Sequence, residues 1–325
     1  MDEVKETLLM LVDVGLRQDS TYSVGMMVHI EFHLREYSNT CHIAITSLLE
    51  SLHKKVMGTF ERFISDQIKG IEEYKVSSKK RSGVLGFIKI FPRFVDRVEA
   101  MLATWDGLTR KTVDLAYAKI IRFMFEVLEQ CAASSSNNSA PAAVAGVGAD
   151  EKDSLNLFIL TIENMHHFFT ETRARKCAGL DEFVRQAKYV YEVNLEGYCQ
   201  MVIRKPLGKL LEFFEGIEVL LKSGPSNEVS FHVQYSKSAL KEVLKRYPGK
   251  EIRKSLEVLY KRVDKHFTED EGLLQVVWRS IQEEFARLLR KYEDIIGKCY
   301  PESNARLDFS MEELLEYFSD MASKH

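Results

Sequence analysis

The sequence predicts an all-α protein, arranged as an elongated rod of consecutive antiparallel helical bundles. Turn-forming residues are scarce, with 6 Pro and 17 Gly in 325 residues, both below average usage of roughly 5% and 7%. Apolar residues recur at alternating spacings of three and four over long stretches, which is the period of a helix face. Strand-like alternation is confined to Val229, Phe231 and Val233, where an extended connector explains it equally well.

The first clear helical pattern lies between residues 113 and 128, and the second between residues 184 and 202. In both, apolar side chains return to one face of a helix after every three or four residues. The two faces are Val113, Tyr117, Ile120, Met124 and Leu128, and Val184, Ala187, Tyr191, Leu195, Tyr198 and Val202. Each pattern predicts a helix that packs one side into a core.

Three more helices are predicted after residue 247, each with its own start signal. Pro248 suits a first helical position, because its fixed φ fits and its missing N–H costs nothing there. Thr268-x-x-Glu271 and Ser310-x-x-Glu313 are capping boxes, in which the side chains satisfy N–H groups that a helix start leaves unpaired. The apolar faces are Ile252, Leu256, Leu259 and Val263; Leu274, Trp278, Ile281, Phe285, Leu288, Tyr292, Ile295 and Cys299; and Leu314, Leu315 and Phe318.

These faces mix aromatic residues, Met and Cys with Leu and Ile. Bulky, varied faces favour antiparallel bundles of several helices. A two-stranded coiled-coil dimer is the alternative, although its seam is usually richer in Ile and Leu.

One low-complexity stretch divides the chain. Ala132 to Asp150 consists mainly of Ala, Ser, Asn and Gly and has little to bury, so we expect a flexible linker or loop over residues 132–152. The expected domains are N-terminal helical bundles at 1–131 and C-terminal helical bundles at 153–325. A shorter basic stretch, Ser77 to Gly86, is expected to be a loop between helices.

Composition excludes several classes of protein. With 45 Lys and Arg against 48 Asp and Glu, the chain lacks the basic excess of a dedicated nucleic-acid binder. No apolar run approaches the roughly 18 residues that span a bilayer, and the opening Met1-Asp2-Glu3 is not that of a signal peptide. Five cysteines without a C-x-x-C pair suggest neither a disulfide framework nor a zinc finger. We therefore expect a soluble, cytosolic protein.

No residue set in the sequence predicts catalysis, a cofactor or a metal. His29 and His33 have a spacing that can place two imidazoles on zinc, but Glu31 falls about 160° away around the helix and could not act on a bound water. The adjacent His166 and His167 point in different directions. The nucleophile, P-loop and dinucleotide motifs are absent from the sequence, so we expect no enzyme.

Charge is distributed unevenly near the C-terminus. Residues 237–266 hold ten Lys and Arg against four Asp and Glu, and residues 267–325 hold seven against thirteen. On the helix after Pro248, four lysines fall within about 60° of one another, opposite the apolar face. This basic face consists of Arg246, Lys250, Arg253, Lys254, Lys261 and Lys265.

Two interpretations of the basic face remain open. It can attract anionic lipid headgroups or an acidic partner, or it can be an ordinary solvated face, since Glu257 and Asp264 interrupt it and Glu257 with Lys261 is a favourable i,i+4 pair. A second basic patch, Lys79 to Arg81 followed by the aromatic-rich Phe87 to Phe91, is either an interfacial loop or a basic loop before a buried helix start.

Six segments of the C-terminal half, together with the ending at His325, resemble the C-terminal region of the Sec-three subunit family of the exocyst. The resemblance is dense from about Glu163 to His325, and no motif supports it before Ala132. The segments are Glu163 to His167, Pro206 to Gly216, Tyr247 to Glu251, Leu259 to His266, Leu273 to Trp278, and Cys299 to Pro301.

The resemblance implies a non-enzymatic vesicle-tethering subunit that lies in the cytoplasm and is recruited peripherally to the plasma membrane. Exocyst subunits are rods of helical bundles, and the complex holds secretory vesicles at the plasma membrane before SNARE-mediated fusion. The implied partners are the other exocyst subunits. In this family the phosphoinositide and Rho-family GTPase contacts belong to an N-terminal pleckstrin-homology-like domain. No β-rich stretch here could form that domain, so we expect a C-terminal fragment, and the alternative function is binding to anionic phosphoinositide lipids through the basic face.

Overall fold

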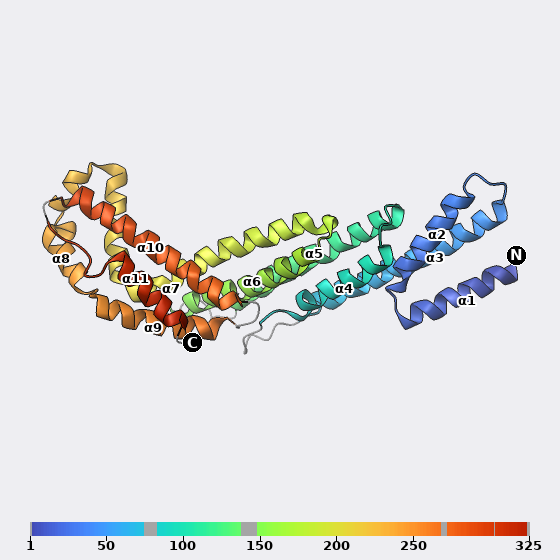
Figure 1. Cartoon of the computed structure of the whole chain (residues 1–325), viewed down its shortest axis with the longest axis horizontal. Helices are drawn as coiled ribbons and strands as arrows, with labels where there is room; N and C mark the ends of the chain where they lie inside the picture. The colour runs from blue at the N-terminus through green and yellow to red at the C-terminus, as the bar shows by residue number, and fades with distance from the viewer. Residues whose placement is uncertain (1, 75–82, 138–147, 268–271, 302, 324–325) are drawn as a thin grey trace. The chain divides into compact units, whose positions relative to one another are not determined.

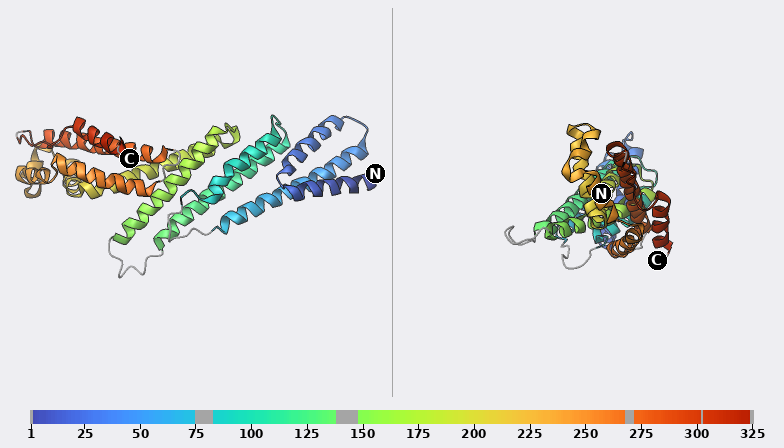
Figure 2. Two further views of the ribbon diagram at one scale, coloured as in Figure 1. Left: turned by 60° about the horizontal axis from the view of Figure 1, so that its bottom comes forward. Right: turned by 90° about the vertical axis from the view of Figure 1, so that its left-hand side faces the viewer.

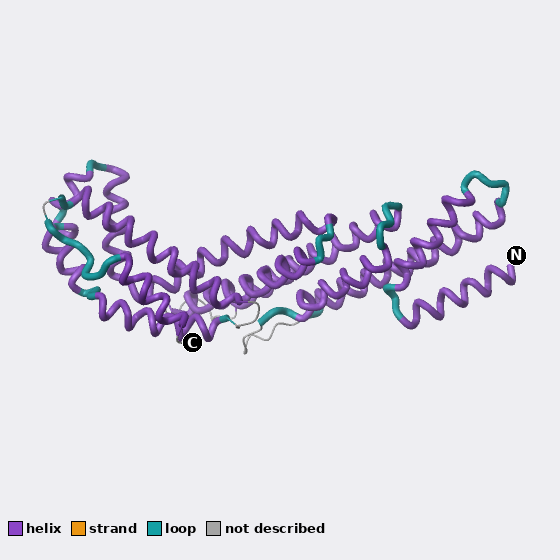
Figure 3. Tube along the Cα trace, viewed as in Figure 1, coloured by secondary structure: helices purple, strands orange, loops and turns teal. Residues whose placement is uncertain are grey.

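The computed structural model describes residues 2–74, 83–137, 148–267, 272–301 and 303–323, and within these residues it is helical without a strand (Figures 1 and 3). The all-α class predicted from the sequence is therefore confirmed. The elongated arrangement stays a prediction, which small-angle scattering tests, because a compact chain of this length has a radius of gyration near 20 Å.

The chain forms two compact units, which share the helices α6 (Gly148–Ala174) and α7 (Asp181–Ser223). Unit 1 consists of Met1–Asp153 and Asn164–Val190, and unit 2 of Ser154–Glu163 and Tyr191–His325. The other helices of unit 1 are α1 (Asp2–Gln18), α2 (Tyr22–Tyr37), α3 (Ile43–Glu72), α4 (Gly86–Leu102), α5 (Leu108–Asn137) and the short 3-10 helix η1 (Ala178–Leu180). Those of unit 2 are η2 (Ser226–Phe231), η3 (Val233–Tyr235), α8 (Lys237–Lys245), α9 (Gly249–His266), α10 (Leu273–Cys299) and α11 (Met311–Ser323).

Unit 1 is held together by a cluster of aromatic side chains. The helices α2 and α3 lie side by side as a hairpin, as the left-hand view of Figure 2 also shows. Further along the unit, the Phe91 ring of α4 stacks on Phe168 of α6 at 5.8 Å and meets Tyr117 of α5 edge to face at 6.1 Å. All three side chains are buried, so the predicted apolar face around Tyr117 packs into a core.

The buried amide of Asn164 fixes the entry to α4. The amide oxygen accepts a hydrogen bond from the Leu85 backbone N–H at 2.7 Å, and its nitrogen donates to the Gly83 carbonyl at 3.1 Å. Gly83 has φ +58°, a left-handed conformation that glycine adopts without strain. A single side chain of α6 thus determines where a distant helix begins.

Unit 2 is organised around α10. Trp278 of this helix donates its indole N–H to the Phe318 carbonyl of α11 at 3.1 Å, and its ring meets Tyr260 of α9 edge to face at 4.9 Å. Further along α10, Tyr292 stacks on Phe214 of α7 at 4.1 Å. In unit 2, aromatic side chains of facing helices pack against one another. This explains why the predicted apolar faces contain aromatic residues among the aliphatic ones.

Several local predictions have different outcomes. Pro248 precedes α9 as its N-cap, one position earlier than predicted. The segment with strand-like alternation forms η2 and η3. Thr268 and Glu271 lie outside the described residues, and α10 begins at Leu273 behind the left-handed Gly272. Of the expected linker, residues 138–147 also lie outside the described residues, while α5 reaches Asn137 and α6 begins at Gly148.

Candidate functional site

The basic face predicted from the sequence is formed by α9 and the end of α8. Its four lysines on α9 are all exposed, and the opposite side of this helix is buried, as its apolar pattern predicted. The buried side chains are Ile252, Leu256, Leu259, Tyr260 and Val263. The structure therefore brings the predicted lysines onto one surface.

Three cations of this face have a carboxylate neighbour on their own helix. The ion pairs are Lys254 Nζ with Glu251 Oε1 (2.9 Å), Lys261 Nζ with Glu257 Oε1 (2.8 Å) and Arg246 Nη2 with Glu242 Oε1 (2.6 Å). Exposed pairs of this kind contribute about 0.2–1 kcal/mol each. These pairs reduce the positive electrostatic potential of the face. Because each contributes so little free energy, an anionic partner can replace the carboxylates at small cost in stability.

Arg253 has a different role from the other cations of the face. Its guanidinium forms an ion pair with Asp320 of α11 and lies 5.5 Å from the centroid of the Tyr317 ring. Because both partners belong to α11, Arg253 stabilises the packing of α9 against α11.

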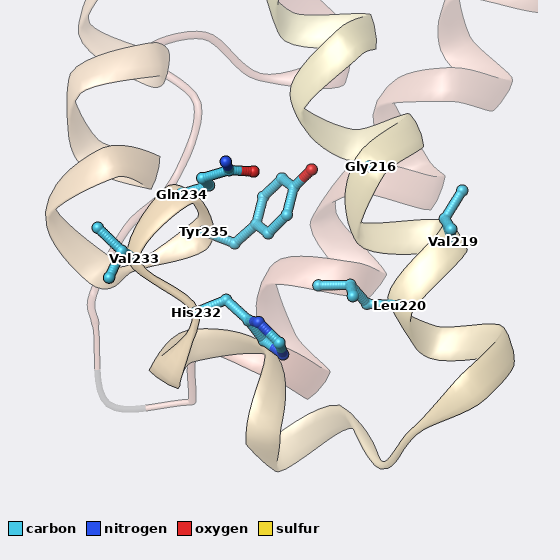
Figure 4. Close-up of a pocket in the computed structure, with 7 residues that line it drawn as sticks. All are labelled: Gly216, Val219, Leu220, His232, Val233, Gln234 and Tyr235. Atoms are coloured by element: carbon cyan, nitrogen blue, oxygen red, sulfur yellow. The ribbon is translucent and has the colours of Figure 1, made fainter.

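A second candidate surface is an apolar pocket between the C-terminal part of α7 and the 3-10 segment. Its volume is about 640 Å³, and Gly216, Val219 and Leu220 line one side of it while His232 to Tyr235 line the other (Figure 4). Around it, large apolar side chains face solvent: Val219 is 64% exposed, Phe231 82% and Val233 89%. Such clustered exposure is typical of surfaces that bind other proteins.

Tyr235 determines the shape of this pocket. Its ring points toward α7 at Gly216, where the hydroxyl occupies the space that a Cβ would need (Figure 4). The Tyr300 hydroxyl donates to the Tyr235 carbonyl at 2.6 Å, and the Phe213 ring packs on the Tyr235 ring at 5.5 Å. The alternation at 229–233 did not predict this surface: in the 3-10 segment Val229 is buried, whereas Phe231 and Val233 are exposed.

Two residues of the predicted histidine motif on α2 contact other side chains. His33 Nδ1 lies 3.1 Å from Glu36 Oε2, and Glu31 faces the start of α5, where its carboxylate accepts four hydrogen bonds. Among the described residues, no three side chains of the metal-binding types converge.

The cysteines of the structure are all free thiols. Burial raises the pKa of Cys199 to about 12, with smaller contributions from the nearby Glu284 and Glu196, and burial likewise raises the pKa values of Cys131, Cys177 and Cys299. These four thiols therefore stay protonated at neutral pH, the form that does not act as a nucleophile.

In the aromatic-rich segment after the second basic patch, Ile88 and Phe91 are buried while Lys89 and Ile90 are exposed. The patch itself, Lys79 to Arg81, lies outside the described residues. No helix within the described ranges combines the length and apolar character needed to span a bilayer.

Comparison with known proteins extends the resemblance seen in the sequence. A family model described as "Exocyst complex component Sec3, C-terminal" matches residues 2–302. Exocyst complex component 1 of Mus musculus is 33% identical over 97% of this chain, and that of Drosophila melanogaster 30% over 95%. Exocyst complex component SEC3A of Arabidopsis thaliana is 25% identical over 94%. The chain spans about a third of the length of each of these relatives.

Proposed function

Because the chain belongs to the family of the C-terminal region of exocyst complex component Sec3, we propose that it is a non-enzymatic part of an exocyst subunit that scaffolds the tethering of secretory vesicles to the plasma membrane. The observation that carries this proposal is the family match over residues 2–302, which reaches into both compact units. The proposed location is the cytoplasm, with peripheral recruitment to the plasma membrane at sites of secretion.

The proposed mechanism is geometric. Long helices carry docking surfaces to fixed positions along a scaffold, and complementary charge helps to select partners. The proposed partners are the other exocyst subunits. The phosphoinositide and Rho-family GTPase contacts that the resemblance places in a pleckstrin-homology-like domain are assigned to no residue of this chain.

The apolar pocket is the proposed docking surface for a sister subunit. Exposed Val219 and Val233 line it, and exposed Phe231 comes directly before the lining residues His232 to Tyr235. Covering large apolar side chains supplies most of the free energy of stable association.

Pairwise co-purification tests the proposed role. The chain is expressed with each of the other exocyst subunits in turn, and we expect at least one to be retained. Replacing Phe231 and Val233 by Ser should abolish that retention, whereas replacing the exposed Leu115 and Tyr189 of unit 1 by Ser should preserve it. Failure of every subunit to bind contradicts the tethering role, and equal effects of the two double variants contradict the docking surface.

A second candidate function is binding to anionic membranes through the basic face. The observation that favours it is the exposure of Lys250, Lys254, Lys261 and Lys265 on one side of α9. Flotation with vesicles that contain phosphoinositide should retain the chain, and replacing Lys254 and Lys261 by Glu should release it. Absence of flotation, or flotation unchanged by the substitutions, eliminates this function.

A further inference from the structure

The helix α1 is apolar on the side that it turns to solvent. At 100° per residue, four of its large apolar side chains fall within about 120° of one another. Their exposed fractions are 53% for Val4, 62% for Met10, 61% for Leu11 and 57% for Val14. We call these four residues the outer face of α1. Exposed apolar side chains that gather on one surface are typical of a binding site for another protein.

The opposite side of α1 holds this helix in unit 1. Leu16 is buried there, and Asp13 pairs with Lys55 of α3 at 2.7 Å. A Cβ on Gly15 would lie 2.6 Å from the Met26 side chain of α2, so these two helices approach each other closely. A docked helix therefore presents the outer face in a fixed orientation.

The spacing along the outer face is that of a seam between two helices. Positions 4, 7, 11 and 14 follow one another at intervals of three, four and three, and they hold Val, Thr, Leu and Val. A repeat of this kind packs its side chains into the gaps between those of another helix. The Thr7 hydroxyl donates to the Glu3 carbonyl at 2.8 Å, so covering Thr7 leaves no unpaired donor.

The charges beside the outer face are divided between its two ends. Glu3 and Glu6 lie near the start of α1 and Arg17 near its end, and the three fall within about 60° of one another around the helix. All three side chains are exposed, and none forms an ion pair with a residue that the structure describes. One edge of the face thus carries negative charge at its start and positive charge at its end.

This charge pattern is complementary to itself when two copies of α1 run antiparallel. In a pair of helices related by a two-fold axis, the same patch of both copies meets. An axis that passes between Met10 and Leu11 places Arg17 of one copy opposite position 4 of the other copy, between Glu3 and Glu6. A parallel pair would instead bring like charges to the same level.

We propose that a second copy of this chain covers the outer face of α1, so that the two copies form a symmetric antiparallel helix pair. The second copy is favoured over other occupants because α1 itself carries both the apolar spacing and the charge order that the face requires. A single helix pair buries less area than the roughly 1,200 Å² of a standard interface, so we expect a weak dimer with a Kd of about 1–100 µM. The inference concerns unit 1 alone and does not rest on the tethering role.

Analytical ultracentrifugation of the chain over about 1–200 µM tests the proposal, and we expect a reversible equilibrium between monomer and dimer. Leu11→Glu should abolish the dimer. Leu115→Glu changes a leucine of α5 that is 65% exposed, and it should leave the dimer unchanged. A chain that stays monomeric throughout this range, or equal effects of the two substitutions, overturns the proposal.

Charge reversal tests the antiparallel order, which apolar association alone does not require. Arg17→Glu should weaken the dimer by about tenfold, and so should Glu3→Lys combined with Glu6→Lys. All three substitutions together should restore the dimer, because opposite charges then meet again. Circular dichroism verifies that each variant is folded. A triple variant that associates no better than the single and double variants overturns the antiparallel pair.

Co-purification identifies a different occupant of the outer face. Because dimerisation is measured on this chain alone, its outcome is independent of whether an exocyst subunit binds. If the unsubstituted chain stays monomeric and Leu11→Glu abolishes retention of another exocyst subunit, the outer face belongs to that subunit and the proposal is wrong.

Discussion

Glu31 shows how one buried carboxylate joins two helices of unit 1. It projects from α2 and accepts hydrogen bonds from the Trp105 indole at 3.0 Å and from the Thr109 N–H and hydroxyl at 2.9 and 2.8 Å, with a further bond from the Leu108 N–H. A helix start leaves N–H groups unpaired and favours negative charge. Glu31 therefore supplies from another helix the cap that α5 lacks in its own sequence.

The pKa of Glu31 reflects this position. Burial acts to raise the pKa of the carboxyl, but the hydrogen bonds from Thr109, Trp105 and Leu108 outweigh burial and lower the pKa from 4.5 to about 2. The charged form is thus favoured in the folded state. The stabilisation is fully present above the pKa of the unfolded chain and is lost as pH falls through the interval from about 4.5 toward 2.

The substitution Glu31→Gln should lower the free energy of unfolding by about 2 kcal/mol at pH 7. Because the wild-type contribution declines in acid, the gap between the two proteins should shrink by pH 3. Urea unfolding followed by circular dichroism at both pH values measures it, with the exposed Glu36→Gln on the same helix as the control. An equal gap at pH 7 and pH 3 would show that the charge is not responsible.

Two glycines of α7 should respond oppositely to the same substitution. A Cβ on Gly216 would lie 2.0 Å from the Tyr235 hydroxyl, whereas a Cβ on Gly208 would meet nothing within 4 Å. Gly208→Ala should raise stability by about 0.5–1 kcal/mol, because alanine loses less backbone entropy in a helix. Gly216→Ala should lower stability by about 1–3 kcal/mol and displace Tyr235. Thermal unfolding measures the stability of both variants. A Gly216→Ala protein as stable as the wild type would contradict the close approach of the Tyr235 hydroxyl to Gly216.

At the scale of single elements, helix faces were largely predictable and helix starts less so. The predicted residues between Val113 and Leu128 are all buried, but on α10 Leu289 is buried in place of the predicted Leu288, which is only half-buried. A straight helix turns every 3.6 residues, so a strict repeat of 3.5 drifts around it. The start of α5 could not be predicted, because its cap comes from α2.

The capping box at Ser310 is confirmed as a reciprocal pair. The Ser310 N–H donates to Glu313 Oε2 at 2.8 Å, and the Glu313 N–H donates to the Ser310 hydroxyl at 3.1 Å. Ser310→Ala should lower the stability of α11 by about 1 kcal/mol. Fluorescence of Trp278, which donates to α11, measured in a Trp105→Phe background, reports the undocking of this helix. Replacing the exposed Ser319 of the same helix by Ala should leave the stability of α11 nearly unchanged. An equal loss of stability in both variants would show that the capping box does not stabilise this helix.

At the scale of the whole molecule, the candidate surfaces divide by how far apart in sequence their residues lie. The basic face belongs largely to one helix, so its period revealed it, and the predicted pairing of Glu257 with Lys261 is confirmed at 2.8 Å. The apolar pocket combines Gly216 of α7 with Tyr235 of η3, and no helical period relates positions so distant. The helical period therefore predicted a charged face on one helix but not the convergence of separate segments.

The division of the chain at residues 132–152 is a prediction that cutting the chain can test. Contacts of unit 1 cross that stretch: among them, Leu85 bonds to Asn164, the Phe91 ring stacks on Phe168, and Arg175 pairs with Asp96 at 2.7 Å. A low-complexity stretch marks a break in helical pattern, but the helices on its two sides belong partly to the same compact unit.

A protease site inserted among residues 138–147 should therefore yield two pieces that stay associated after cleavage. Their binding rests on the buried aromatic stack and on the Asn164 amide, whose removal leaves the Leu85 N–H and the Gly83 carbonyl without their partner. Size-exclusion chromatography after cleavage measures the association, and Asn164→Ala with Phe168→Ala should release the pieces. Separation of the unsubstituted pieces without denaturant would instead establish 132–152 as the boundary between independently folded domains.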